Sequence, residues 1–223
     1  MTVLDRLAQE AIALAERDSQ ARVKRRAILG IAGNPGAGKS TLVEVLMPRI
    51  AAIKGDEWVA HVPMDGFHLA DSQLDRLGNR DRKGAPDTFD ALGYAHLLER
   101  IAQEDTDPVY APGFDRTLEQ PLAGALVVLP SARLVITEGN YLLLEDPRWV
   151  RAREAMAAVW FVASEEALRV DRLVERHVRF GKSAQQARAW VAGTDQLNAE
   201  LVSTTLPRAD RVVVNDSAGW TLA

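Results

Sequence analysis

The chain of 223 residues contains no cysteine, and aromatic residues make up only 6% of it. The absence of cysteine excludes disulfides and thiol chemistry, and it is compatible with the cytoplasmic location that we expect. The four histidines are scattered too widely along the sequence to predict a zinc site.

The sequence also lacks a long hydrophobic run. No segment approaches the roughly 20 apolar residues that a helix needs to span a bilayer. The most apolar candidate, residues 155–163, is better explained as a buried strand. Asp5 and Glu10 interrupt the apolar pattern of residues 1–18, which argues against a signal peptide and predicts an amphipathic helix that packs on the domain. We therefore expect no membrane partner.

No excess of positive charge is present either. The chain has 27 Lys and Arg residues against 31 Asp and Glu residues, a formal net charge of -4. This balance argues against a nucleic-acid-binding protein, although a homodimer is compatible with it. The length suits a single α/β domain over residues 1–223, and no repeat or linker divides the chain.

Short apolar segments with the character of strands alternate with helical segments along the chain. This order predicts an α/β fold with a mostly parallel five-stranded sheet and helices on both faces. The five predicted strands are 27–32, 57–64, 132–139, 157–163 and 209–216.

Caps mark two of the predicted helix starts. Asp90 can cap a helix that runs to about Glu104, and Ser183 with Gln186 has the spacing of a capping box. Residues 106–124, rich in proline and glycine, predict loops with short strands.

A glycine-rich segment, GNPGAGKST, lies between the first predicted strand and a helix over residues 39–53. It satisfies the phosphate-loop pattern G-x-x-x-x-G-K-[ST], in which backbone amides surround anionic oxygens at the start of a helix. Lys39 would reach the β and γ phosphates, and the Ser40 hydroxyl would bind Mg²⁺. The predicted nucleotide-binding residues are Gly33, Asn34, Pro35, Gly36, Ala37, Gly38, Lys39, Ser40 and Thr41.

Two acidic residues come at the ends of apolar strands. Asp65 follows the strand over residues 57–64, and Glu138 ends the segment LVITE. Ligands of α/β sheets bind at the carboxyl ends of the strands. We therefore predict Asp65 as the catalytic base and Glu138 as the carboxylate on the metal side. A role for either as a simple strand-end cap stays open.

Four arginines follow one another at spacings of three, four and three residues, a pattern that aligns them along one helix face. Such a helix can close over a transferring phosphoryl group and exclude water, so we predict a helical lid over about residues 165–193. A solvated, salt-bridged face is the alternative, because Asp171 and Glu175 partly offset the positive charge. The arginines are Arg169, Arg172, Arg176 and Arg179.

These motifs resemble, in their order, the superfamily of uridine kinase, phosphoribulokinase and bacterial pantothenate kinase. The resemblance covers about residues 27–214 and is greatest to nucleoside/nucleotide kinase-like proteins labelled as fructose transport system kinases. It implies a three-layer P-loop NTPase fold with a helical lid, and ATP- and Mg²⁺-dependent transfer of a γ-phosphoryl group to the hydroxyl of a small molecule. It rests on the phosphate loop, MDGFH, RKGAPDTFD, PVYAPGFDR, ITEGNYLLL and ERHVRFGKS.

The resemblance also implies roles for single residues. Asp65 matches the family aspartate that serves as the base or orients the acceptor, and Arg176 matches the lid arginine that faces the phosphoryl group. Asn198 falls near a substrate-contacting asparagine. Independently of the resemblance, we expect His68 to contact the substrate, because it follows Asp65 by only three residues. The acceptor pocket would also be lined by Lys83, Tyr110 and Arg116.

Departures from the family patterns leave the acceptor open. Ala111 stands where pantothenate kinase carries a histidine, Leu173 and His177 replace aromatic residues of its pocket, and the Tyr-Asp-His element of uridine kinases is missing. A sugar such as fructose, a nucleoside and a pantothenate-type vitamin remain candidates. An accessory NTPase or switch that acts on a protein partner, or a binding module without catalysis, is the alternative. The commonest switch and transporter NTPases are disfavoured, because the chain contains neither the guanine-recognition motif N-K-x-D nor the transporter motif L-S-G-G-Q.

Overall fold

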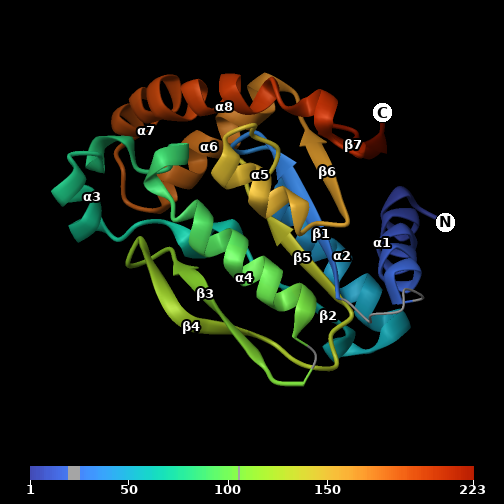
Figure 1. Cartoon of the computed structure of the whole chain (residues 1–223). Helices are drawn as coiled ribbons and strands as arrows, with labels where there is room; N and C mark the ends of the chain where they lie inside the picture. The colour runs from blue at the N-terminus through green and yellow to red at the C-terminus, as the bar shows by residue number, and fades with distance from the viewer. Residues whose placement is uncertain (20–25, 105) are drawn as a thin grey trace.

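The structure is a computed structural model, and it describes residues 1–19, 26–104 and 106–223. Its centre is a six-stranded sheet in the order β2-β5-β1-β6-β7-β8 (Figure 1). The strands are β2 (Val59–His61), β5 (Leu134–Glu138), β1 (Ala27–Gly33), β6 (Ala158–Ala163), β7 (Arg211–Asp216) and β8 (Gly219–Leu222).

Five of these strands are parallel, as predicted, but the expected total of five strands is wrong by one. The additional strand, β8, pairs antiparallel with β7 at the edge of the sheet. The chain reverses there in a tight turn, in which the Asp216 side chain accepts a hydrogen bond from the amide of Ala218 at 2.8 Å and Gly219 has a φ of 113°. A short, half-exposed segment at the end of the chain has too little apolar pattern to predict a strand.

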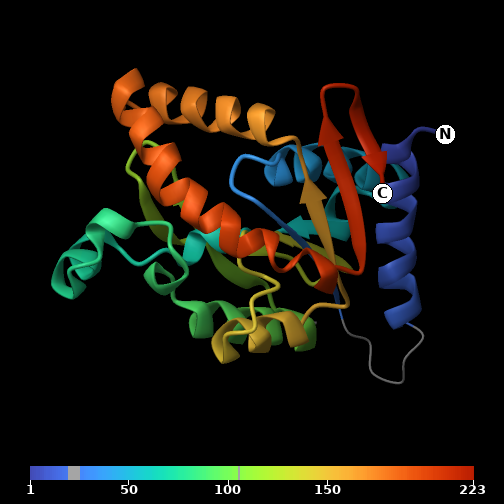
Figure 2. The ribbon, with the colours of Figure 1, turned by 90° about the horizontal axis from the view of Figure 1, so that it is seen from above.

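Helices cover both faces of the sheet, which gives the three layers that the sequence predicts. On one face α1 (Val3–Ser19) and α2 (Lys39–Lys54) contribute to an apolar core, and on the other α4 (Ala91–Gln103) and α5 (Pro147–Glu154) do so. Figure 2 shows α2 and the pair α4 and α5 on opposite sides of the strands. All seven residues of β1 are buried between these layers, which explains why this strand is a continuous apolar run.

A separate antiparallel hairpin is formed by β3 (Val109–Asp115) and β4 (Gln120–Val128). The segment predicted as loops with short strands is therefore more regular than expected. The hairpin lies beside the turn that follows β2, and the short helix α3 (Asp71–Leu77) lies in the same region of the molecule (Figure 1).

The predicted lid region is helical. Residues 165–193 contain α6 (Glu166–Arg179), α7 (Ala184–Trp190) and the start of a π-helical turn (Val191–Asp195). The helix α8 (Gln196–Ser203) follows directly and extends the helical region beyond the predicted bounds. The capping box is confirmed, because Ser183 and Gln186 exchange side-chain hydrogen bonds of 3.2 and 2.9 Å with each other's amides. The cap at Asp90 is confirmed as well, since its side chain accepts from the amide of Gly93 at 2.8 Å.

In the part of the chain that the structure describes, none of the helices combines the length and the apolar character that crossing a bilayer requires.

Candidate active site

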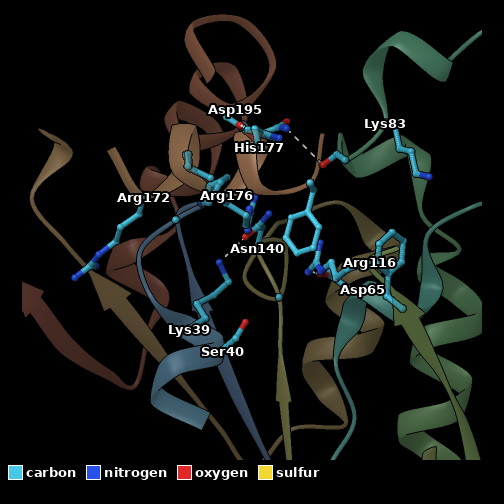
Figure 3. Close-up of a pocket in the computed structure, with 18 of the residues that line it drawn as sticks. Lys39, Ser40, Asp65, Lys83, Arg116, Asn140, Arg172, Arg176, His177 and Asp195 are labelled. Atoms are coloured by element: carbon cyan, nitrogen blue, oxygen red, sulfur yellow. Dashed lines mark hydrogen bonds and ion pairs between the residues drawn. The ribbon is translucent and has the colours of Figure 1, made fainter. Parts of the chain in front are cut away.

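A cavity of about 1040 Å³ opens at the carboxyl ends of the parallel strands, where α/β sheets bind their ligands. The phosphate loop forms its floor, and residues that follow β2 and β5 form one wall. The lid helices and the tip of the β3–β4 hairpin enclose it from the other sides (Figure 3). Residues between Pro35 and Trp220, from many elements of the fold, thus converge on one cavity.

The phosphate loop lies between β1 and α2, as its sequence predicts. Gly38 has a φ of 99°, and a Cβ atom at this position would lie 2.2 Å from Nδ2 of Asn215. Only glycine fits there. The same Nδ2 atom donates a 2.9 Å hydrogen bond to the carbonyl of Ala37, so the end of β7 holds the loop in place.

Lys39 extends from the start of α2 across the loop. Its Nζ atom donates hydrogen bonds of 3.0 Å to the carbonyls of Gly33 and Asn34, and one of 2.6 Å to Oδ1 of Asn140. Only 8% of the residue is exposed, and this burial lowers the pKa of its ammonium group to about 8. The group therefore stays largely protonated at neutral pH and can bind an anionic oxygen.

Ser40 and Glu138 face each other beside the loop. The Ser40 hydroxyl donates to Oε1 of Glu138 at 3.1 Å, and the carboxylate is almost fully buried at the end of β5. Burial raises the pKa of Glu138, and the nearby charge of Asp65 raises it further. A cation bound at this point would offset both effects.

The oxygen donors at this point suit Mg²⁺ bound together with phosphates. Within the described ranges no cluster of three or more His, Cys, Asp or Glu side chains could hold a metal ion alone. Mg²⁺ commonly takes only one or two protein oxygens and completes its shell with phosphates and water. Ser40 and Glu138 are a donor set of this kind.

Asp65 lies in the 3₁₀ turn Met64–Phe67 that follows β2, where its side chain receives a hydrogen bond from Nη2 of Arg116 (Figure 3). Burial by itself would raise the pKa of Asp65. The positive charges of His68 in its protonated form, of Arg116 and of Lys39 outweigh this effect and lower the pKa below its ordinary value. The carboxylate is therefore ionised at neutral pH.

Gly66 explains how the hairpin reaches Asp65. A Cβ atom at Gly66 would lie 2.2 Å from the carbonyl oxygen of Pro112 in β3, so glycine allows the two backbones to approach closely. This approach brings Arg116, which follows β3, to the carboxylate.

His68 also lies in the cavity wall. Its ring packs between Phe89 and Phe114, with centroid distances of 4.0 and 4.8 Å. Its Nδ1 atom is 2.8 Å from the carbonyl oxygen of Asp65, and burial lowers the pKa of the imidazole. The neutral ring is thus a fixed part of the wall next to the carboxylate.

Lys83 and Asn198 line the cavity too. Lys83 donates to Oδ1 of Asp71 at 2.6 Å, and Asn198, buried in α8, donates to the carbonyl of Gly84 at 3.4 Å. Both residues thus face the end of the cavity that contains Asp65, rather than the phosphate loop. Figure 3 shows this position for Lys83.

The prediction for Tyr110 is wrong. This side chain is 63% exposed and does not line the cavity. Side chains alternate between the two faces of a strand, and Val109 and Ala111 point into the core. Tyr110 must therefore point outward, to solvent.

The four predicted lid arginines separate into two groups. Arg172, Arg176 and Arg179 line the cavity, whereas Arg169 does not. Arg169 is only 3% exposed and donates to Oε1 of Gln196 at 2.7 Å and to the carbonyl of Pro35 at 3.4 Å. Arg169 supports the phosphate loop, because α6 packs directly on the loop backbone at Gly36.

Several polar residues of the cavity were missed from the sequence. Asn140 and Asn215 follow the same strand-end rule as Asp65 and Glu138, so this rule applied more widely would have found them. Asp195 was missed as well; its Oδ2 atom lies 2.8 Å from Nε2 of His177, a residue whose sequence position already corresponded to the pocket of a related kinase. No sequence pattern links two residues on different helices.

Comparison with known proteins shows which proteins this chain is similar to. No family model matches the chain. The "Putative uridine kinase C227.14" of Schizosaccharomyces pombe is 34% identical over 198 residues, which cover 85% of this chain and 83% of that protein. The "ATP-dependent kinase-like protein notR'" of Aspergillus versicolor is 35% identical over 162 residues, 68% of this chain and 94% of the relative.

A solved structure has the same fold over almost its whole length. It is that of a "putative fructose transport system kinase" from Silicibacter sp. TM1040, which is 33% identical and superimposes with a TM-score of 0.81 over 95% of this chain and 99% of that one. The resemblance inferred from the motifs is confirmed. The chain belongs to the family of P-loop kinases that contains these relatives.

Proposed function

We propose that this P-loop kinase transfers the γ-phosphoryl group of ATP, with Mg²⁺, to a hydroxyl group of a small molecule. The observation that carries the proposal is the division of one cavity into two ends (Figure 3). Lys39 and Ser40 of the phosphate loop lie at one end, and the ion pair of Asp65 and Arg116 lies at the other.

The phosphate-loop end suits the donor. Lys39 would exchange its present hydrogen bonds to carbonyl and amide oxygens for bonds to the β and γ phosphates. Ser40 and Glu138 would hold Mg²⁺, which supplies charge neutralisation at the phosphates. ATP is the proposed nucleotide because the Aspergillus relative is named an ATP-dependent kinase-like protein.

The opposite end suits the acceptor. The ionised Asp65 carboxylate can accept the hydroxyl proton while the acceptor oxygen forms a bond to the γ phosphorus. The bond between the γ phosphorus and the bridging oxygen breaks at the same time, and ADP leaves. Arg116 fixes the position of the carboxylate during this step.

The lid supports transfer rather than hydrolysis. Arg172, Arg176 and Arg179 face the cavity from α6, and we assign to Arg176 the contact with the transferred phosphoryl group. Positive charge stabilises the equatorial oxygens in the transition state, and a closed lid excludes competing water.

We propose a sugar such as fructose as the first acceptor class, because the Silicibacter relative is named for fructose transport. A nucleoside is the alternative supported by the name of the S. pombe relative, and a pantothenate-type vitamin is a further alternative.

The test is an acceptor screen with ATP and Mg²⁺, in which ADP formation is followed together with the mass of the phosphorylated product. Sugars, nucleosides and vitamins are supplied singly. We expect one class to raise ADP formation well above the rate without acceptor and to gain one phosphoryl group. ADP formation that stays at the basal rate with every acceptor, and rises only with a protein partner, would favour a switch or accessory NTPase instead.

A further inference from the structure

A pair of ionisable side chains in the lid has no part in the proposed phosphoryl transfer. His177 of α6 and Asp195, at the end of the π-helical turn, lie 2.8 Å apart between Nε2 and Oδ2. Both line the cavity, and Figure 3 places them above the space between Lys39 and Asp65. Asp195 is only 7% exposed, an unusual degree of burial for a carboxylate.

The π-helical turn sets the direction of Asp195. Helices α7 and α8 are continuous through Val191–Asp195, where the wider turn inserts extra backbone into the helix. Such turns are rare and are frequent at functional sites. Asn198 follows Asp195 by three residues, so both side chains lie on one face of the helix, and both line the cavity.

Each of these two side chains keeps one oxygen available. Among the described residues, the only hydrogen bond to the Asp195 carboxylate is the one that Oδ2 shares with His177, and Oδ1 has no partner. The amide nitrogen of Asn198 points to the carbonyl of Gly84, so its Oδ1 atom is also left without a donor in the described ranges. Two hydrogen-bond acceptors are therefore presented by successive turns of one helix.

Two cations at this end of the cavity already have carboxylate partners. Arg116 pairs with Asp65, and Lys83 pairs with Asp71 at 2.6 Å. An acceptor carboxylate or phosphate that bound Arg116 or Lys83 would have to displace one of these partners, and it would also meet the charge of Asp195. Hydroxyl groups, in contrast, can donate to both free oxygens.

Taking the kinase activity proposed above as its basis, we infer that Asp195, positioned by His177 and acting with Asn198, is the specificity determinant of the acceptor site and selects an uncharged, polyhydroxylated acceptor. Neighbouring hydroxyl groups of the acceptor donate to Asp195 and Asn198, while the reacting hydroxyl faces Asp65. Like-charge repulsion at Asp195 discriminates against acceptors with a carboxylate at that end.

The test compares matched acceptors that differ only in one charged group. The enzyme is saturated with a non-hydrolysable ATP analogue and Mg²⁺, and dissociation constants are measured by calorimetry or by ligand-observed NMR. The ligands are three alditol and aldonate pairs: glycerol and glycerate, ribitol and ribonate, and glucitol and gluconate. We expect at least one alditol to bind about tenfold or more tightly than its aldonate. Tighter or equal binding of the aldonates, or binding of none of the alditols, would overturn the inference.

Variants distinguish a role of Asp195 in the choice of acceptor from a purely structural role, in which its contact with His177 only holds the lid helices together. In Asp195→Asn the alditol preference should fall about tenfold, because the charge is lost and the shape is kept. His177→Gln retains a side-chain N–H donor to Asp195 and should keep the preference. Asp171→Asn removes a carboxylate from the exposed side of α6, outside the cavity, and is the matched control.

The outcomes distinguish this inference from the proposed function. An unchanged preference in Asp195→Asn, or a loss in His177→Gln as large as in Asp195→Asn, refutes selection by the Asp195 charge. The wild-type comparison gives an answer even where Asp195→Asn does not fold. A lack of any phosphorylated product in the acceptor screen refutes the kinase proposal, and it leaves these binding constants readable.

Discussion

Asn215 offers the sharpest test of how the tertiary structure builds the phosphate loop. Its side chain, 6% exposed, donates a 2.9 Å hydrogen bond to the carbonyl of Ala37, which is fully buried. Asn215→Ala removes the donor and leaves that carbonyl without a partner. An orphaned buried polar group costs about 1–3 kcal/mol, so we expect the free energy of unfolding to fall by about this amount, out of a total of roughly 5–15 kcal/mol for a typical domain.

The same change should weaken nucleotide binding. The loop amides must point inward before phosphates arrive, and Asn215 helps to hold the backbone in that arrangement. We expect the dissociation constant for MgATP to rise roughly tenfold, which corresponds to about 1.4 kcal/mol. Urea unfolding followed by tryptophan fluorescence gives the first quantity, and titration calorimetry gives the second.

Two further variants make this prediction specific. Asn215→Asp also lacks the donor and adds a negative charge near the phosphates, so its loss of affinity should exceed that of Asn215→Ala. Thr221→Ala, at an exposed position on the neighbouring strand β8, should change stability by less than about 0.5 kcal/mol. Unchanged stability and unchanged MgATP affinity in Asn215→Ala would refute the reasoning.

The remaining predictions concern the transfer itself, measured with an acceptor identified by the screen. Asp65→Asn should lower kcat roughly 10²- to 10⁴-fold, as expected for loss of a general base, with MgATP affinity little changed; full activity would exclude that role. Arg116→Gln removes one of the charges that lower the pKa of Asp65, so the pKa should rise. Activity requires the ionised carboxylate, so the acidic limb of the pH profile of kcat/KM should move to higher pH; an unmoved limb would contradict this pairing. Glu138→Gln should raise the Mg²⁺ concentration for half-maximal activity roughly tenfold, and an unchanged requirement would remove Glu138 from the metal side.

Sequence patterns predicted those elements whose conformation depends on residues close together in the chain. The phosphate loop needs glycine at left-handed positions such as Gly38, and a strand before it and a helix after it complete its context. Caps at Asp90 and Ser183 satisfy free amides within three residues, so their helix starts could be predicted closely. The strand-end positions of Asp65 and Glu138 likewise follow from apolar runs that end in a carboxylate.

Other features depend on which side chains meet across the fold. The sequence predicted four aligned arginines, but only the packing of α6 on the phosphate loop made Arg169 a buried support and left the others facing the cavity. Tyr110 lies outside the site because the core takes the alternate positions of β3.

The sequence by itself therefore determined the nucleotide-phosphate loop, the α/β order and the positions of the candidate catalytic base and the candidate metal-side carboxylate, because each depends on residues close together in the chain. The tertiary structure decided the edge strand β8, the contact of Asn215 with the loop, and the pairing of Asp65 with Arg116 and of His177 with Asp195. These contacts join residues far apart in sequence or on different elements, and only packing of the strands and helices brings them within hydrogen-bonding distance.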